Sequence, residues 1–514
     1  MSIMQWAADR RRSGRHARTV AMSVEDAAAP ALPAAQVAAH AAAPLRQAAS
    51  PGAAVTPGAA GTLSAAEQRR AALLTAPILP TLLKLAAPTV TVLVAQTAVN
   101  IAEAYYVGFL GTDALAGAAL VFPIFMLMTM MSNGGFGSGV ASSVARAVGA
   151  GRRDDAEAAL FHAVVLAILA GGVFTLGVTL GGPWLYRTLG GQGDALAAAT
   201  TYSNYLFAGA IPVWIVNLQA AALRGSGNVK VPALVTLVGA IVTIPVSPAL
   251  IFGLGPIPRL GIGGAGVAFG LYYGAAMLFL LRYMASGATG LKLHIVPLRP
   301  KIFGDMLTVG IPTAFNAVLT NLTVILVTGA VGLFGTSALA GYGIASRLDY
   351  IMIPLLFGIS TATLTMVGVN MGAGQTARAR RIGWISGIVG MVMTGTIGLL
   401  VAIFPTAWLN LFSRDAEVVS EGMTYLRIVA PAYAALGFGF VTSFAAQGTG
   451  RAMGPLASSI ARILIAAGGG WIAVASFGAG MAGLATMVAV ALVAYAAICA
   501  LVMLSPSTWR SEFT

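Results

Sequence analysis

Two carboxylates lie inside stretches of sequence that are otherwise apolar. Glu103 belongs to a run that starts near Pro80, and Asp349 stands about halfway along residues 339–360. An ionised carboxylate within a bilayer is costly, so such a side chain normally faces a cavity or a partner, and such residues often carry protons or ions. The sequence therefore offers two candidates for proton or cation chemistry.

Glu103 cannot reach water by extending its side chain. It lies eight residues before Gly111, which corresponds to about 12 Å along a helix that rises about 1.5 Å per residue. A carboxylate removed from water takes up a proton more readily, so Glu103 is suited to bind a proton on one side of a membrane. Protonation removes the charge that holds a cationic substrate, and competition for one site is the simplest form of antiport. The alternative is a neutral structural Glu that is held by hydrogen bonds.

The elements that position these carboxylates must be membrane spans. The chain is 58% hydrophobic and 9% charged, whereas soluble domains carry about 25% charged residues. A helix of roughly 20 apolar residues crosses the hydrocarbon core of a bilayer. We expect an all-α integral membrane protein with twelve transmembrane helices. They lie near 82–109, 113–142, 157–182, 194–220, 230–254, 262–284, 305–333, 337–369, 381–405, 418–444, 454–477 and 480–503.

The net charge of +13 indicates how the chain is oriented in the membrane, and nucleic-acid binding is the less favoured explanation. Fourteen Lys and Arg residues, Arg146 and Arg224 among them, fall at the span ends on one side of the predicted membrane. The other side has only Arg187, Arg259 and Arg414. Because basic residues concentrate in the cytoplasm, we expect both termini there. The bilayer is the expected partner, and no nucleic acid is expected.

Residues 1–76 differ in composition from the rest of the chain. They are basic and rich in Ala and Pro, with few bulky apolar side chains to bury. We therefore predict a disordered cytoplasmic tail. The alternatives are a true start further along, with Met22 as a candidate, and an arm that touches anionic lipid.

The remainder of the chain contains one unit twice. The phrase "LGTDALAG" at 110–117 returns as "FGTSALAG" at 334–341, 224 positions later. Each copy holds six spans, so the two copies share one orientation and are related by a pseudo-twofold axis along the membrane normal. We predict an N-lobe at 77–290 and a C-lobe at 291–514. Further matches pair Pro88 with Pro312, Trp184 with Trp408, and "LRGSGNVKVP" (223–232) with "AQGTGRAMGP" (446–455).

Over roughly residues 77–503 the sequence resembles the multidrug and toxic compound extrusion (MATE) family. The resemblance is carried by "YYVGFLGTDALAG" in the first span, by "ARAVGAGRRDDA" and "NMGAGQTARARRI" at helix ends, and by "LRGSGNVKVP". It implies a secondary antiporter, not an enzyme and without a cofactor, that exports amphipathic or cationic compounds in exchange for H⁺ or Na⁺. We expect a monomer in a bacterial inner membrane.

The resemblance assigns a coupling role to Glu103, because the family normally has a coupling Asp at this first-span position. The likeness is closer to the DinF-like branch, in which a proline matching Pro88 is implicated in a helix bend. Thr243 and Ser247 stand where that branch has Asn and Asp. A lone carboxylate with uncharged oxygens favours H⁺ over Na⁺.

The NorM-like branch uses acids in the seventh and tenth spans. Thr320 and Leu436 occupy those positions here, so we predict that its sodium site is absent.

Several further residues are candidates for a substrate cavity. Met and aromatic side chains adapt to varied shapes, although at helical spacing they also serve packing or face lipid. Asp349 is either a cavity charge that meets a cationic drug or part of a structural ion pair, for which Arg427 is one candidate partner. The candidates are Asp349, Tyr106, Phe125, Met128 and Asn321.

Two other functions remain open. A flippase for a lipid-linked precursor, from the same superfamily, tends to line its cavity with basic residues, which are scarce in these spans. An intramembrane lipid or prenyl transferase needs acidic or His clusters, and the four His show no metal spacing. The sequence also lacks a Walker A pattern for ATP. Drug export is therefore the preferred interpretation.

Overall fold

A computed structural model describes residues 64–256 and 258–510, and all secondary structure in these ranges is helical. The elements of the first half are α1 (Ala65–Thr75), α2 (Ile78–Gly108), α3 (Thr112–Met130), η2 (Met131–Phe136), α4 (Gly137–Gly149), α5 (Arg153–Thr188), α6 (Gly193–Ala208), α7 (Ala210–Gly225), α8 (Lys230–Phe252) and α9 (Ile262–Ala285). Those of the second half are α10 (Pro300–Gly332), α11 (Thr336–Gly372), α12 (Thr376–Ile403), α13 (Pro405–Leu409), α14 (Ala416–Val429), η3 (Ala430–Ala432), α15 (Tyr433–Gly448), α16 (Met453–Ile463), η4 (Leu464–Gly469), α17 (Gly470–Phe477), α18 (Met481–Leu504) and η5 (Pro506–Trp509).

The described residues contain eleven helices long and apolar enough to cross a membrane, or twelve when α6 and α7 count as one span. These two helices meet at 47° around Gly209. The all-α expectation is confirmed, and the predicted spans agree with these helices. The bend within 194–220 was not predicted, because apolar composition continues through it.

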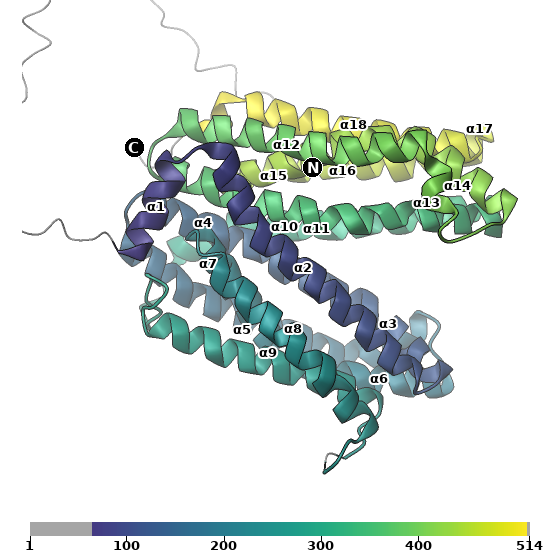
Figure 1. The fold of residues 1–514 in the computed structure, drawn as a ribbon, viewed down its shortest axis with the longest axis horizontal. Coiled ribbons are helices and arrows are strands. Elements are labelled where there is room, and N and C mark those ends of the chain that lie inside the picture. The colour runs from purple at the N-terminus through teal and green to yellow at the C-terminus, as the bar shows by residue number, and fades with distance from the viewer. Residues whose placement is uncertain (1–63, 257, 511–514) are drawn as a thin grey trace, which may run out of the picture. The chain divides into compact units, whose positions relative to one another are not determined.

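Two groups of helices make up this part of the chain, one drawn in purple to teal (α2–α9) and one in green to yellow (α10–α18) in Figure 1. Each group encloses its own hydrophobic core. Trp214 and Phe207 are fully buried in the first core, and Leu426 and Leu484 are fully buried in the second. The two cores correspond to two lobes.

The lobes meet where α4 packs against the last turns of α11. A side-chain carbon on Gly149 would lie 2.0 Å from the Val369 carbonyl oxygen, and one on Gly372 would lie 2.0 Å from the Arg146 carbonyl oxygen. Gly149 and Gly372 are 223 positions apart, as are Arg146 and Val369. The same close crossing is therefore made twice, as a pseudo-twofold axis requires.

The chain enters this crossing through α1, and here the predicted disorder is wrong. Ser64 and Glu67 form a capping box, in which each side chain accepts a hydrogen bond from the backbone N–H of the other. The Ser64 hydroxyl also donates to the Glu67 carboxylate at 2.8 Å, and this bond, together with the one from the Ser64 N–H, holds the pKa of Glu67 below its usual value. The Ser-x-x-Glu spacing is a helix-start signal that the compositional argument overlooked. Residues 1–63, which complete the predicted tail, lie outside the described residues.

Helix α1 contacts both lobes. Arg70 donates hydrogen bonds to the carbonyl oxygens of Val148 at 2.9 Å and Gly149 at 2.8 Å, at the end of α4. Asn370 of α11 donates to the Leu73 carbonyl oxygen at 3.1 Å, and the Leu73 side chain is buried. We call the end of the bundle at which α1 joins α4 and α11 the α1 end.

Candidate functional site

Glu103 lies inside the N-lobe, on α2, where α2 packs against α8. Tyr202 of α6 donates a long hydrogen bond of 3.5 Å to the Glu103 carboxylate. The carboxylate is half-buried, and it takes part in none of the ion pairs formed by the described residues. Its one hydrogen-bonding neighbour in that part of the chain is therefore a neutral hydroxyl, which leaves its charge free to be cancelled by a proton or a cation.

Pro88 stands fifteen residues before Glu103 on the same helix. It lies inside α2, which continues without interruption from Ile78 to Gly108. Because proline has no N–H, it removes one hydrogen bond from the helix and leaves a point at which bending is easier. A bend of α2 at Pro88 stays a prediction.

Thr243 and Ser247 lie on α8, the helix that packs against α2. The Thr243 hydroxyl donates to the Gly239 carbonyl oxygen of its own helix at 2.7 Å. The Ser247 hydroxyl is buried and has no hydrogen-bond partner. Within the described ranges neither hydroxyl bonds to Glu103. Tyr202 takes the place that we expected them to fill, and no motif in the sequence marked it.

Two of the predicted cavity residues serve packing in the N-lobe. Met128 is fully buried in the N-lobe core in this structure, and its role in a substrate cavity stays a prediction. Phe125 packs edge-on against Phe269, with ring centroids 5.0 Å apart. Tyr106 is half-buried beside Val107, in a small cluster that joins α2 to α8.

Asn321 lies on α10 and reaches across to the N-lobe. Its side-chain nitrogen is 3.2 Å from the Met130 sulfur, at the end of α3, and also donates to the Ala317 carbonyl oxygen at 2.9 Å. Asn321 is the one predicted cavity residue that the structure brings against the opposite lobe.

Asp349 lies inside the C-lobe, and it forms no ion pair with the predicted partner Arg427 among the described residues. Arg427 is exposed, so it does not form the ion pair that we considered. The groups that act on the Asp349 carboxylate are Tyr433, through a hydrogen bond, and Arg462 of α16, through its charge. One carboxylate oxygen of Asp349 is buried without a hydrogen-bond partner. Glu103 and Asp349 thus belong to different lobes and to separate polar clusters.

Two arginines that we assigned to span ends point between the lobes instead. Arg146 is almost fully buried and forms an ion pair of 2.5 Å with Asp305 at the start of α10. Arg224, on the last turn of α7, donates to the Asn133 side-chain oxygen at 2.7 Å. The two helices, α4 and α7, run on to Gly149 and Gly225, beyond the predicted span ends at 142 and 220. These side chains also turn inward, which a hydropathy pattern cannot reveal.

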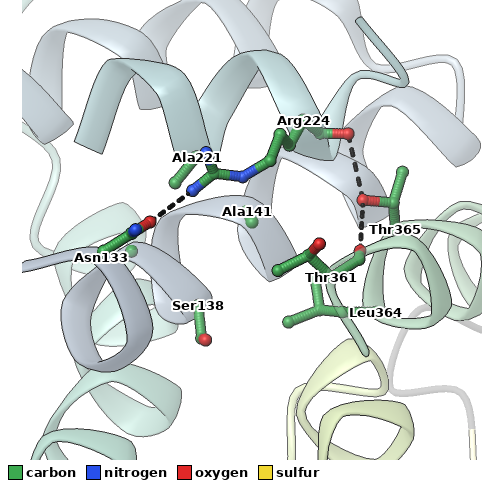
Figure 2. Close-up of a pocket in the computed structure, with 9 residues that line it drawn as sticks. Asn133, Ser138, Ala141, Ala221, Arg224, Thr361, Leu364 and Thr365 are labelled. Atoms are coloured by element: carbon green, nitrogen blue, oxygen red, sulfur yellow. Dashed lines mark hydrogen bonds between the residues drawn. The ribbon is translucent and has the colours of Figure 1, made fainter. Parts of the chain in front are cut away.

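Arg224 lines a small pocket between the lobes, of ≈ 10 Å³ (Figure 2). The N-lobe side comes from η2, α4 and α7, and the C-lobe side comes from α11. The lining residues are Asn133, Gly137, Ser138, Ala141, Ala221, Arg224, Thr361, Leu364 and Thr365.

Comparison with known proteins identifies the architecture. The family model MatE matches residues 88–249 and again residues 312–472. The chain therefore belongs to the MatE family. The two matches begin 224 positions apart, which is the offset of the internal repeat.

Curated relatives are 22–31% identical to this chain over the aligned residues. A FAD transporter of Shewanella oneidensis is 26% identical over 403 residues, which cover 77% of this chain and 88% of that protein. A probable multidrug resistance protein NorM of Deinococcus radiodurans is 31% identical over 353 residues, covering 63% and 70%. A multidrug export protein MepA of Staphylococcus aureus is 22% identical over 362 residues, covering 69% and 78%.

Solved structures share the fold. A MATE protein in the bent conformation superimposes with a TM-score of 0.78 at 22% identity, covering 86% of this chain and 97% of that one. An outward-facing multidrug resistance MATE family transporter superimposes with a TM-score of 0.75 at 23% identity, covering 84% and 96%. The predicted two-lobe fold is confirmed.

Proposed function

We propose that this chain is a secondary active antiporter that exports amphipathic or cationic compounds in exchange for H⁺, and less readily Na⁺. Membership of the MatE family and the names of the multidrug relatives support export. The name of the FAD transporter adds flavin nucleotides to the compounds to be tested. We also retain the closer likeness to the DinF-like branch as part of this proposal.

The observation that carries the proposal is the position of Glu103 inside the N-lobe with a neutral Tyr202 hydroxyl as its neighbour. When the carboxylate is ionised, its charge attracts a cationic substrate. When a proton arrives, the charge disappears and the attraction is lost. Because one carboxylate cannot hold both, proton entry and substrate release become linked.

Exchange also requires that Glu103 face the two sides of the membrane in turn. Transporters with parallel halves do this by rocking the halves about a central site. In this structure the lobes are closed at the α1 end by the crossing of α4 with α11 and by the Arg146–Asp305 ion pair. Opening at that end must break this pair.

We place the protein as a monomer in a bacterial inner membrane, with the α1 end in the cytoplasm. The support is the surplus of Lys and Arg at the span ends on this side, since such residues are retained in the cytoplasm. Single cysteines introduced at Arg187 and Arg414 would then react with an impermeant thiol reagent from outside intact cells. The native Cys499 is buried, so it contributes little background.

The coupling role of Glu103 is tested by reconstituting wild type, Glu103→Gln and Glu103→Asp into liposomes. A pH gradient and a separate Na⁺ gradient are imposed, and movement of tetramethylrhodamine methyl ester, a fluorescent organic cation, is followed. We expect the pH gradient to drive transport by wild type and by Glu103→Asp, which keeps a titratable group. We expect Glu103→Gln, which carries no charge at this position, to lose gradient-driven transport and to bind the cationic dye more weakly than wild type does.

Other results would redirect the proposal. Transport driven only by Na⁺ would keep export and reject the proton. Equal transport by wild type and Glu103→Gln would show that Glu103 has a structural role. Asp349 would then be the next residue to substitute. Failure of both gradients with every cation would favour the flippase, for which lipid-linked substrates are the next probes.

A further inference from the structure

The last turns of α7 and α15 occupy equivalent positions in the two lobes. Arg224 and Gln447 stand 223 positions apart, at matching places in the repeated phrase. Across the lobe interface, the Thr365 hydroxyl donates to the Arg224 carbonyl oxygen at 3.0 Å, and the Ser142 hydroxyl donates to the Gln447 carbonyl oxygen at 2.5 Å. Thr365 and Ser142 are also 223 positions apart. The scaffold therefore makes the same bond between the lobes twice.

The two side chains differ although the backbone contacts match. Gln447 is fully buried, and its side-chain nitrogen and oxygen have no hydrogen-bond partner among the described residues. Arg224 is charged, and its guanidinium points toward Asn133 of η2 (Figure 2). An uncharged glutamine occupies the equivalent position in the C-lobe. The packing of the scaffold therefore does not require the charge of Arg224 in the N-lobe.

Among the described residues, no acidic side chain pairs with the guanidinium of Arg224. It takes part in none of the ion pairs formed within 64–256 and 258–510, and no acidic side chain lines its pocket. A long basic side chain near a span end can extend to the membrane surface, yet this one lies between the lobes. Arg224 is half-buried, and even partial burial of a cation without a counter-charge is costly. Its position therefore points to a ligand that supplies the negative charge.

The pocket supplies polar groups around this cation. Asn133, Ser138, Thr361 and Thr365 line it together with Arg224. Asn133 belongs to a π-helical turn, and such turns occur frequently at functional sites. The planar guanidinium matches the paired oxygens of carboxylate and phosphate groups. The chemistry of the pocket therefore fits an oxyanion.

We propose that Arg224 binds an oxyanion, a phosphate or a carboxylate, that belongs to the transported compound. The inference rests on the proposed transport function and defines its substrate class as amphipathic molecules that carry an anionic group. The cavity beside Arg224 measures ≈ 10 Å³, about the volume that one water molecule needs. Because both lobes form its walls, the anion enters when the lobes part at the α1 end, and their closure expels it.

Equilibrium binding to the detergent-purified full chain tests this proposal without any ion gradient. Two matched pairs of fluorescent probes differ only in the anionic group: flavin mononucleotide with riboflavin, and tetramethylrhodamine with its methyl ester. We expect wild type to bind the anionic member of at least one pair about tenfold more tightly, since hydrogen bonds between charged groups have that order of strength. The pair that responds identifies phosphate or carboxylate as the group recognised.

Arg224→Gln should abolish this preference and leave unchanged the affinity for the probe that lacks the anionic group. Gln447 shows that the scaffold accepts glutamine at the equivalent position. Arg224→Lys should retain part of the preference, and Arg224→Met provides a second charge removal if the glutamine variant melts early. Lys230→Gln, at the exposed start of α8, removes one positive charge nearby and should bind like wild type.

The proposal is overturned if wild type shows no preference in either pair, or if the charge-removing variants keep it. Transport in liposomes is measured separately from binding, so that failure of the Arg224 site can be distinguished from failure of the antiport proposal. Wild type that moves the methyl ester with a pH gradient but shows no anion preference would lose the Arg224 site and keep the antiport function. Anion preference without gradient-driven transport would keep the Arg224 site and reject the antiport function.

Discussion

At the scale of single residues, Glu103 could be predicted from the sequence and Tyr202 could not. The sequence alone reveals a carboxylate among apolar residues, and such a residue is costly to place in lipid. This much can be recognised without knowing its neighbours in the fold. Its partner depends on how α2 and α6 pack, and no spacing in the chain encodes that. For Met128, in contrast, the residue type alone was a poor guide to its surroundings. Methionine suits an adaptable binding surface, but in this structure its side chain lies in the core.

Tyr202→Phe removes the hydrogen bond that the phenol donates to the Glu103 carboxylate. The ionised carboxylate then loses a stabilising partner, so protonated Glu103 releases its proton less readily. We expect the pH profile of dye transport to move toward higher pH by several tenths of a unit, since a typical hydrogen bond contributes about 1 kcal/mol. Maximal transport should fall less than in Glu103→Gln.

Tyr283→Phe is the matched control for this variant, because Tyr283 stacks on Phe279 of its own helix. Its pH profile should coincide with that of wild type. A profile for Tyr202→Phe that also coincides would show that the long bond to Glu103 has no part in coupling.

At the scale of elements, most spans could be predicted because each is a continuous apolar run. Both ends of α2 and the start of α3 lie close to the expected positions. Helix α1 was missed because its residues resemble the tail in composition. Its stability comes from contacts that only the folded chain supplies, namely the arginine bonds to α4 and the burial of Leu73.

Arg70→Ala removes both hydrogen bonds from α1 to the end of α4. Bonds from a charged donor contribute about 1.5–3 kcal/mol each, and the loss is reduced because water can replace the donor at this edge of the bundle. We expect faster amide hydrogen exchange throughout α1 and little change in the spans. Hydrogen exchange followed by mass spectrometry measures this directly.

Arg414→Ala serves as the comparison, since Arg414 is exposed between α13 and α14. Its exchange pattern should match that of wild type. If α1 in Arg70→Ala exchanged as slowly as in wild type, the burial of Leu73 alone would hold this helix.

At the scale of the whole molecule, the repeat in the sequence predicted two similar lobes but not the surface on which they meet. Small residues recur throughout the chain, and only the positions of the axes of α4 and α11 decide which glycines face a carbonyl oxygen of the other lobe. The inward-turned Arg146 and Arg224 escaped prediction for the same reason.

Gly149→Ala places a methyl carbon where the Val369 carbonyl oxygen already lies, and Gly372→Ala does the same to Arg146. We expect either variant to separate the lobes at the α1 end. Spin labels on α5 and α12 near this end should report a longer distance than in wild type. Because the two crossings are pseudo-equivalent, the two variants should give similar changes.

Gly177→Ala on α5 is the control, since a side-chain carbon there meets no atom within 4 Å. Its label distances should equal those of wild type. Unchanged distances in both crossing variants would mean that the helices shift locally without moving the lobes.

Among the described helices α1 is the first to be made, yet its contact with Asn370 joins residues 297 positions apart. During synthesis α1 therefore leaves the ribosome long before α11 exists and cannot complete its contacts until most of the chain has been inserted. The first of the described helices to be translated is thus among the last to dock. Until then its arginines and Leu73 remain available to chaperones and proteases, so docking of α1 marks the completion of assembly.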